Sequence, residues 1–143
     1  MNAPAADSPV FFDTNIFLYA DDPRDYRKQT RAVQLIRDHI VADLAMVSVQ
    51  VMQEYFAAAT RKLMIDVGLA RRKVELMSKM RVVQPTATSV LSAIDLHARS
   101  QISIWDALIV VAAREGGAAV LFSEDLKHGS VLAGVTVINP FEL

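Results

Sequence analysis

Short apolar runs alternate with longer stretches of helical periodicity along this chain. The apolar runs are typical of buried strands and cover residues 10–12, 45–49, 118–122 and 135–138. The stretches between them predict a helix that starts near Asn15 and further helices over 26–40, 49–62, 69–80, 86–100 and 104–115. Strands that alternate with helices predict a parallel sheet in a doubly wound α/β fold.

The segment 49–100 shows helical patterns in succession and no strand pattern between them. We therefore expect these helices to form a helical side of the molecule. Such an arrangement would leave a groove near the ends of the strands, where ligands bind in open α/β sheets.

The composition predicts one globular domain over residues 10–143, preceded by a flexible leader over 1–9. Of the 143 residues 52% are hydrophobic and 22% are charged, which supplies a core and argues against disorder. The leader lacks the regions of a signal peptide, and no apolar run reaches the roughly 18 residues of a membrane span. The absence of cysteine excludes disulfides, thiolate catalysis and Cys-based zinc sites. We expect a cytoplasmic protein without membrane contact.

Two acids lie just beyond apolar runs, Asp13 after residues 10–12 and Asp125 after residues 118–122. If these runs are adjacent parallel strands, both acids lie at the edge of the sheet where ligands bind. Each acid could instead cap a following helix, since Asp is a favoured N-cap residue. Glu124 could also be the inward-facing acid in place of Asp125.

Two further acids, Glu54 and Asp106, have no cation three or four positions away on their own helices. Asp106 has a second interpretation, because Ser103-x-x-Asp106 resembles a capping box at a helix start. Asp95 differs from both, since Arg99 lies four residues on and predicts a structural ion pair.

The three histidines show no zinc-ligand spacing, and only His128 stays a weak candidate because it follows Asp125 by three residues. Phosphate-binding loops, dinucleotide fingerprints and nucleophile elbows are absent from the sequence. The carboxylates are the remaining candidates for a catalytic site. Clustered in a cleft they would repel one another, and a hard cation such as Mg²⁺ or Mn²⁺ would relieve that repulsion. Such a site is suited to phosphodiester hydrolysis.

The formal net charge of −1 hides a basic segment. Seven basic and two acidic residues lie within 61–81, so this segment could attract a nucleic acid through residues such as Arg71 and Arg72. The alternative is a solvated helix face on which these arginines pair with Glu75.

Four motifs, FFDTNIFLYA, QEYF, WDALIVVAA and LFSEDLKHG, occur in an order that resembles the PIN-domain family, and in particular its VapC-type toxin ribonucleases. The resemblance extends over residues 10–141. It matches the family's acidic quartet to Asp13, Glu54, Asp106 and Asp125, and its supporting polar positions to Asn15 and Ser123. It implies a three-layer α/β/α fold, a Mg²⁺- or Mn²⁺-dependent endoribonuclease acting on RNA, frequent homodimers, and neutralisation by a small antitoxin protein that covers the active groove.

Two other functions stay open at this point. A haloacid-dehalogenase-like phosphatase also places an aspartate after its first strand, but it needs a second aspartate where this chain has Asn15. A PIN-like module could also bind RNA or a protein without cutting, although the presence of all four acids argues against that function.

Overall fold

One mixed sheet organises the molecule. In the computed structural model, which describes residues 7–142, six strands pair in the order β3-β2-β1-β4-β6-β5. They span Val10–Phe12 (β1), Ala45–Ser48 (β2), Arg81–Val83 (β3), Val120–Phe122 (β4), Val131–Leu132 (β5) and Val135–Ile138 (β6). All pairings are parallel except that of β5 with β6. The predicted, mainly parallel sheet is confirmed.

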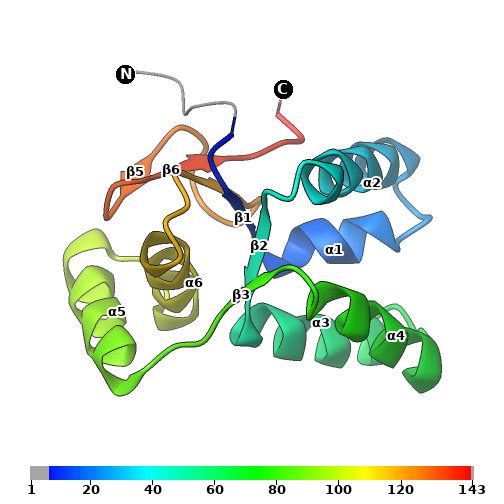
Figure 1. Ribbon diagram of the computed structural model, residues 1–143, viewed down its shortest axis with the longest axis horizontal. Coiled ribbons are helices and arrows are strands. Elements are labelled where there is room, and N and C mark those ends of the chain that lie inside the picture. The colour runs from blue at the N-terminus through cyan, green and yellow to red at the C-terminus, as the bar shows by residue number, and fades with distance from the viewer. Residues whose placement is uncertain (1–6, 143) are drawn as a thin grey trace.

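Helices cover both faces of this sheet, and the expected three layers are present. Figure 1 shows α5 and α6 on one side of the strands and α1 to α4 on the other. The helices span Thr14–Ala20 (α1), Tyr26–Val41 (α2), Val49–Arg61 (α3), Val67–Met77 (α4), Ala87–Ser100 (α5) and Ile104–Glu115 (α6). None of the helices in the described part of the chain is long and apolar enough to cross a membrane. Residues 1–6 of the predicted leader lie outside the described residues.

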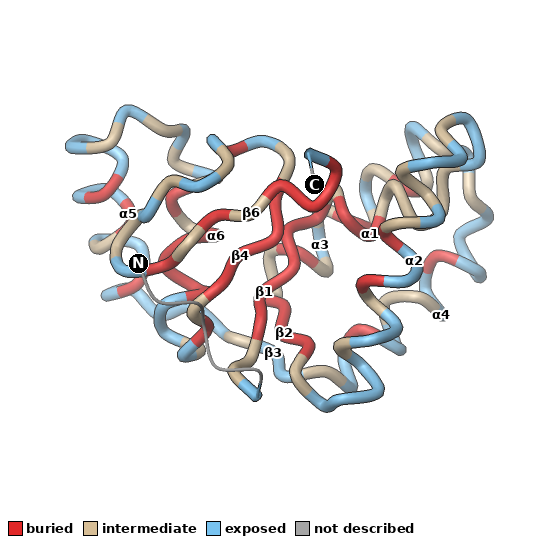
Figure 2. The backbone as a smooth tube through the Cα atoms, turned by 90° about the horizontal axis from the view of Figure 1, so that it is seen from above, coloured by how far each residue is buried: buried red, intermediate tan, exposed pale blue. Residues whose placement is uncertain are grey.

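The hydrophobic core lies along the central strands and α6. Every residue of β1 and β4 is buried, and the buried trace runs through β1, β2 and β4 in Figure 2. Phe12 of β1 stacks on Phe122 of β4 with 5.5 Å between ring centroids. Gly116, just after α6, permits close packing on the sheet, because a Cβ there would lie 2.8 Å from Val83 Cγ2. The core therefore holds the ends of β1 and β4 rigidly side by side.

Side chains that cap helices fix where the helices begin. Ser48 accepts a hydrogen bond from the backbone N–H of Val51, and Asp66 caps α4 in the same way. These caps move two predicted boundaries. The strand predicted over 45–49 ends at Ser48, and the helix predicted over 69–80 begins at Val67 and ends at Met77.

The expectation that residues 49–100 contain no strand is wrong, because β3 lies within them. Arg81 and Val82 are exposed, since β3 is an edge strand that pairs only with β2. An exposed edge strand lacks the buried apolar run by which strands are recognised in a sequence. The short antiparallel β5 at the opposite edge escapes prediction for the same reason.

Candidate active site

Three carboxylates from distant parts of the sequence meet at the carboxyl edge of the sheet. Asp13, Asp106 and Asp125 each offer an oxygen, and these oxygens lie within 4.8 Å of one another. We call these three residues the acidic cluster. One member follows β1, one follows β4 and one lies in the first turn of α6. The sheet and α6 together therefore assemble a site that no single segment contains.

Asp13 is fixed between the end of β1 and the start of α1. Its Oδ1 accepts a hydrogen bond from the backbone N–H of Thr14 at 2.7 Å, so it is the N-cap residue of α1. Its Oδ2 accepts a hydrogen bond from Ser123 Oγ, also at 2.7 Å, and the residue is only 4% exposed. The capping contact and membership of the acidic cluster occur together in Asp13.

Ser123 connects the two strand ends. Its Oγ donates to Asp13 and accepts a hydrogen bond from the backbone N–H of Asp125 at 3.2 Å. The backbone N–H of Asp13 in turn donates to the carbonyl oxygen of Phe122 at 3.0 Å. The fully buried Ser123 thus sets the turn that carries Asp125 toward the acidic cluster.

Glu124, the alternative inward-facing acid, does not join the acidic cluster and contacts other residues. Its Oε2 forms an ion pair with Lys28, and its Oε1 accepts a hydrogen bond from the Tyr19 hydroxyl at 2.5 Å. Its backbone N–H donates to Asn15 Oδ1 at 3.4 Å. Asp125, not Glu124, is the member of the acidic cluster.

Asp106 lies in the first turn of α6, three residues after the N-cap residue Ser103. Ser103 Oγ accepts a hydrogen bond from the Asp106 backbone N–H at 3.0 Å, which is the serine half of the capping box that the sequence predicts. This cap uses the backbone of Asp106. The half-buried Asp106 carboxylate joins the acidic cluster.

Glu54 lies on α3, beside the acidic cluster and not within it. Its Oε1 accepts a hydrogen bond from Thr14 Oγ1 at 2.7 Å, and its Oε2 accepts one from Gln50 Nε2 at 3.2 Å. Gln50 Nε2 also donates to the carbonyl oxygen of Trp105 at 3.1 Å. The Glu54 carboxylate is therefore held between α1 and α6, and its charge contributes to raising the pKa of Asp106.

Burial and mutual repulsion shift two of these acids. Burial raises the pKa of Asp13 to about 7; its two hydrogen bonds oppose the rise, and the charges of Asp125 and Asp106 add to it. Burial also raises the pKa of Asp106, with further contributions from the charges of Asp125 and Glu54. Each additional negative charge at this edge of the sheet is costly in the metal-free protein.

This donor set fits a divalent metal ion. The acidic cluster offers only carboxylate oxygens, which suit Mg²⁺ and Mn²⁺ and do not favour zinc. Within the described residues no Lys or Arg forms an ion pair with Asp13, Glu54, Asp106 or Asp125. A cation would relieve the repulsion that the raised pKa values of Asp13 and Asp106 reflect.

The two supporting positions differ in their contacts. Ser123 bonds directly to Asp13, whereas Asn15 lines a pocket beside Asp125 and contacts the backbone of Glu124. Asn15 Nδ2 is buried and has no hydrogen-bond partner among the described residues. The weak candidate His128 has a structural role, because its Nδ1 accepts a hydrogen bond from the backbone N–H of Asn139 at 3.0 Å.

Sequence reasoning missed Thr14 and Gln50, which hold the Glu54 carboxylate. Gln50 precedes Glu54 by four residues, which is a helical contact spacing, but a search for cation partners does not consider glutamine. Thr14 is separated from Glu54 by 40 residues, and only the fold brings them together.

The candidate RNA-binding arginines lie on the exposed surface of α4. Arg71 forms the expected i,i+4 ion pair with Glu75 at 3.5 Å, and Arg72 is exposed. The predicted pair of Asp95 with Arg99 is not formed in the described structure, where both residues are exposed on α5.

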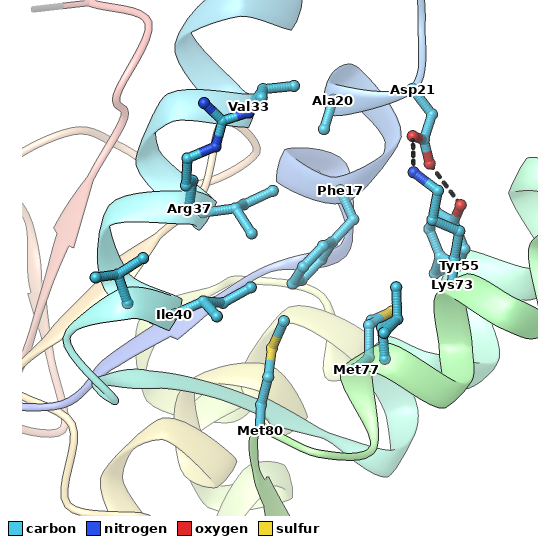
Figure 3. Close-up of a pocket in the computed structure, with 13 residues that line it drawn as sticks. Phe17, Ala20, Asp21, Val33, Arg37, Ile40, Tyr55, Lys73, Met77 and Met80 are labelled. Atoms are coloured by element: carbon cyan, nitrogen blue, oxygen red, sulfur yellow. Dashed lines mark hydrogen bonds and ion pairs between the residues drawn. The ribbon is translucent and has the colours of Figure 1, made fainter.

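A separate apolar cavity of about 350 Å³ lies between α1, α2, α3 and α4 (Figure 3). Its lining is mostly apolar and includes Phe17, Ile40 and Met77. At its edge Asp21 accepts hydrogen bonds from Tyr55 at 2.5 Å and from Lys73 at 2.7 Å. The members of the acidic cluster take no part in this lining.

The comparison with family models identifies this architecture. The model described as PIN domain matches residues 10–131, and the chain belongs to the PIN domain family. No curated protein matches the sequence.

Solved structures with the same fold include bacterial toxins. The Mycobacterium tuberculosis toxin VapC20, described as cleaving the sarcin-ricin loop, superposes with a TM-score of 0.67 at 22% identity, over 81% of this chain and 91% of that chain. A toxin-antitoxin complex from Klebsiella pneumoniae gives 0.69 at 18% identity, over 94% and 99%. DNA-bound VapBC from Salmonella typhimurium gives 0.61 at 18% identity, over 91% and 96%.

Proposed function

We propose that this protein is a metal-dependent endoribonuclease of the VapC type, the toxin of a toxin-antitoxin pair. The observation that carries the proposal is the acidic cluster, in which three carboxylates without a cation partner converge at the ligand-binding edge of a PIN-domain sheet. The raised pKa of Asp13 supports a site built to receive a positive ion.

In this proposal Asp13, Asp106 and Asp125 hold Mg²⁺ or Mn²⁺, and Glu54 supplies the fourth carboxylate of the catalytic set. Such an ion, when bound, would supply Lewis-acid polarisation of a phosphoryl oxygen and a bound water of lowered pKa. Ser123 positions two of the ligands through its hydrogen bonds to Asp13 and to the backbone of Asp125.

Glu54 is oriented for its role by two donors on different elements. Thr14 Oγ1 and Gln50 Nε2 each donate to one of its oxygens, which restricts the rotation of the carboxylate. We assign Asn15 to the edge of the site, where its carbonyl oxygen fixes the backbone of the turn before Asp125.

Purified protein incubated with single-stranded RNA tests the proposal. We expect cleavage with Mg²⁺ or Mn²⁺, no cleavage with a chelator, and no cleavage by Asp106→Asn. RNA binding without metal-dependent cleavage would reject the nuclease and favour a binding module. Turnover of a small phosphate ester through a trapped aspartyl phosphate would favour a phosphatase.

We also propose a small antitoxin protein as partner, a homodimer as the assembly, and the cytoplasm as the compartment in which RNA is met. The superposing Klebsiella pneumoniae structure is described as a toxin-antitoxin complex, which supports the first of these. If a short reading frame lies immediately upstream, co-expression of its product should abolish cleavage. Equal cleavage with and without that product would reject it as the antitoxin, and light scattering of the purified chain decides the oligomeric state.

A further inference from the structure

A second hollow adjoins the acidic cluster. It has a volume of about 220 Å³ and lies between α1, the end of α3 and the turn after β4. Asp125 and Asn15 line it, as do Leu18, Lys62 and Leu63, and we call it the side pocket. Because Asp125 belongs to both the acidic cluster and the side pocket, a polymeric ligand that crosses the acidic cluster can continue into the side pocket.

The charges of the side pocket are paired, with two exceptions, Asp125 of the acidic cluster and Lys62. Arg24 binds Asp22 through two hydrogen bonds of 2.9 Å, from Nε and Nη2. Glu124 is paired with Lys28. Lys62 is exposed and forms no ion pair with any described residue. Lys62 is therefore the cation of this pocket that is free to meet an anion.

The remaining lining is suited to a base or a sugar. Leu18, Ala58 and Leu63 are partly exposed and give the pocket an apolar side. Its volume is below the roughly 300–1,000 Å³ of pockets for drug-sized ligands, so it has room for a small moiety. Single-stranded RNA offers such a moiety, because its unstacked bases can be splayed out and its phosphates repeat at every nucleotide.

We propose that the side pocket is a subsite for the nucleotide next to the scissile phosphate. Lys62 contacts a flanking backbone phosphate, and Leu18 and Leu63 contact the sugar or base. This inference rests on the proposed function, since the acidic cluster supplies the cleavage point from which the flanking nucleotide is counted. The ligand class is single-stranded RNA, recognised through its backbone charge and one unstacked base.

Lys62 is also the C-cap residue of α3, where a cation is favourable for the helix. A role limited to the helix end predicts that Lys62→Met lowers the melting temperature and leaves the kinetics unchanged. A phosphate contact predicts instead that Lys62→Met changes the kinetics and leaves the melting temperature unchanged. Loss of this contact in Lys62→Met should raise KM and reduce its salt dependence, because each phosphate contact on a single strand contributes about 0.7 to the slope of log affinity against log salt.

The test compares Lys62→Met with Arg99→Met in a cleavage assay on mixed-sequence single-stranded RNA with Mn²⁺. Arg99 is an exposed cation on α5, outside both the side pocket and the basic segment 61–81. We expect Lys62→Met to raise KM about tenfold, to lower the salt slope by about 0.7 and to change kcat less than twofold. Arg99→Met should match the wild type, and Lys62→Arg should restore KM.

Fluorescence anisotropy with the same RNA in the presence of a chelator separates this inference from the proposed function. If the wild type binds RNA and Lys62→Met binds about tenfold more weakly, the subsite stands even where no cleavage is seen, and the nuclease proposal alone fails. If Lys62→Met and Arg99→Met give the same KM, the same salt slope and the same affinity, the subsite is rejected while cleavage stands.

Discussion

Replacing Asp13 by Asn should remove the pH dependence of stability that this residue imposes on the metal-free protein. An unfolded chain ionises Asp near its ordinary pKa of 3.8, whereas the folded protein keeps Asp13 protonated up to a pKa of about 7. Between these values the folded state binds one more proton than the unfolded state. The free energy of unfolding therefore falls as the pH rises through this window.

The magnitude follows from the gap between the two pKa values. Each pKa unit corresponds to about 1.4 kcal/mol, so ionising Asp13 in the folded, metal-free protein costs about 4 kcal/mol by pH 8. Asn is neutral at every pH and has nearly the same shape. It can still accept from the Thr14 N–H and can donate to Ser123 Oγ, with a loss of about 1 kcal/mol for the altered hydrogen bonds.

Urea unfolding followed by circular dichroism between pH 4 and pH 8, with a chelator present, measures this difference. At pH 4 Asp13→Asn should be about 1 kcal/mol less stable than the wild type, and at pH 8 about 3 kcal/mol more stable. Adding Mn²⁺ at pH 8 should stabilise the wild type by mass action and the variant much less. Parallel pH curves for the two proteins, or an equal response to Mn²⁺, would refute the reasoning.

Three other sets of substitutions test separate parts of the account. Asp106→Asn should abolish cleavage and the Mn²⁺ response while leaving metal-free stability unchanged or higher. The control Asp95→Asn should leave both cleavage and the Mn²⁺ response unchanged. Thermal unfolding with and without Mn²⁺ distinguishes the two variants. Charge reversal of Arg71 and Arg72 to Glu should weaken RNA binding and flatten its salt dependence without altering the Mn²⁺ response, and an unchanged salt slope would make α4 a solvated face. Gly116→Ala should lower the free energy of unfolding by about 1–3 kcal/mol, as urea unfolding would measure, because the new Cβ overlaps side chains of the sheet.

The sequence predicts the central sheet because its inner strands are buried on both faces. The runs that contain β1 and β4 are wholly apolar, so their ends, and with them Asp13 and Asp125, can be located from the apolar pattern alone. The edge strand β3 leaves no such pattern. Two of its three residues are exposed, and their pairing with β2 is a contact between chain segments that no local pattern records.

The candidate site, like the fold, is predicted from the sequence only in part. Sequence spacing shows that Glu54 and Asp106 lack cation partners on their own helices, and within the described residues neither acid forms an ion pair. The spacing does not show that three of the four acids meet within 4.8 Å while Glu54 is held beside them by Thr14. Nor does the spacing give the pKa of Asp13, which depends on burial in the fold and on the hydrogen bond from Ser123, 110 residues away in the sequence.

RNA cleavage by the purified chain during removal and return of metal tests the central claim most directly. Labelled single-stranded RNA is incubated with wild type and with Asp106→Asn prepared in parallel, first with Mn²⁺, then with excess chelator, then with Mn²⁺ restored. The acidic cluster predicts cleavage by the wild type alone, lost with chelator and regained with metal. Cleavage that persists in chelator, or that is equal in Asp106→Asn, would contradict the assignment of this cluster as the metal-dependent active site.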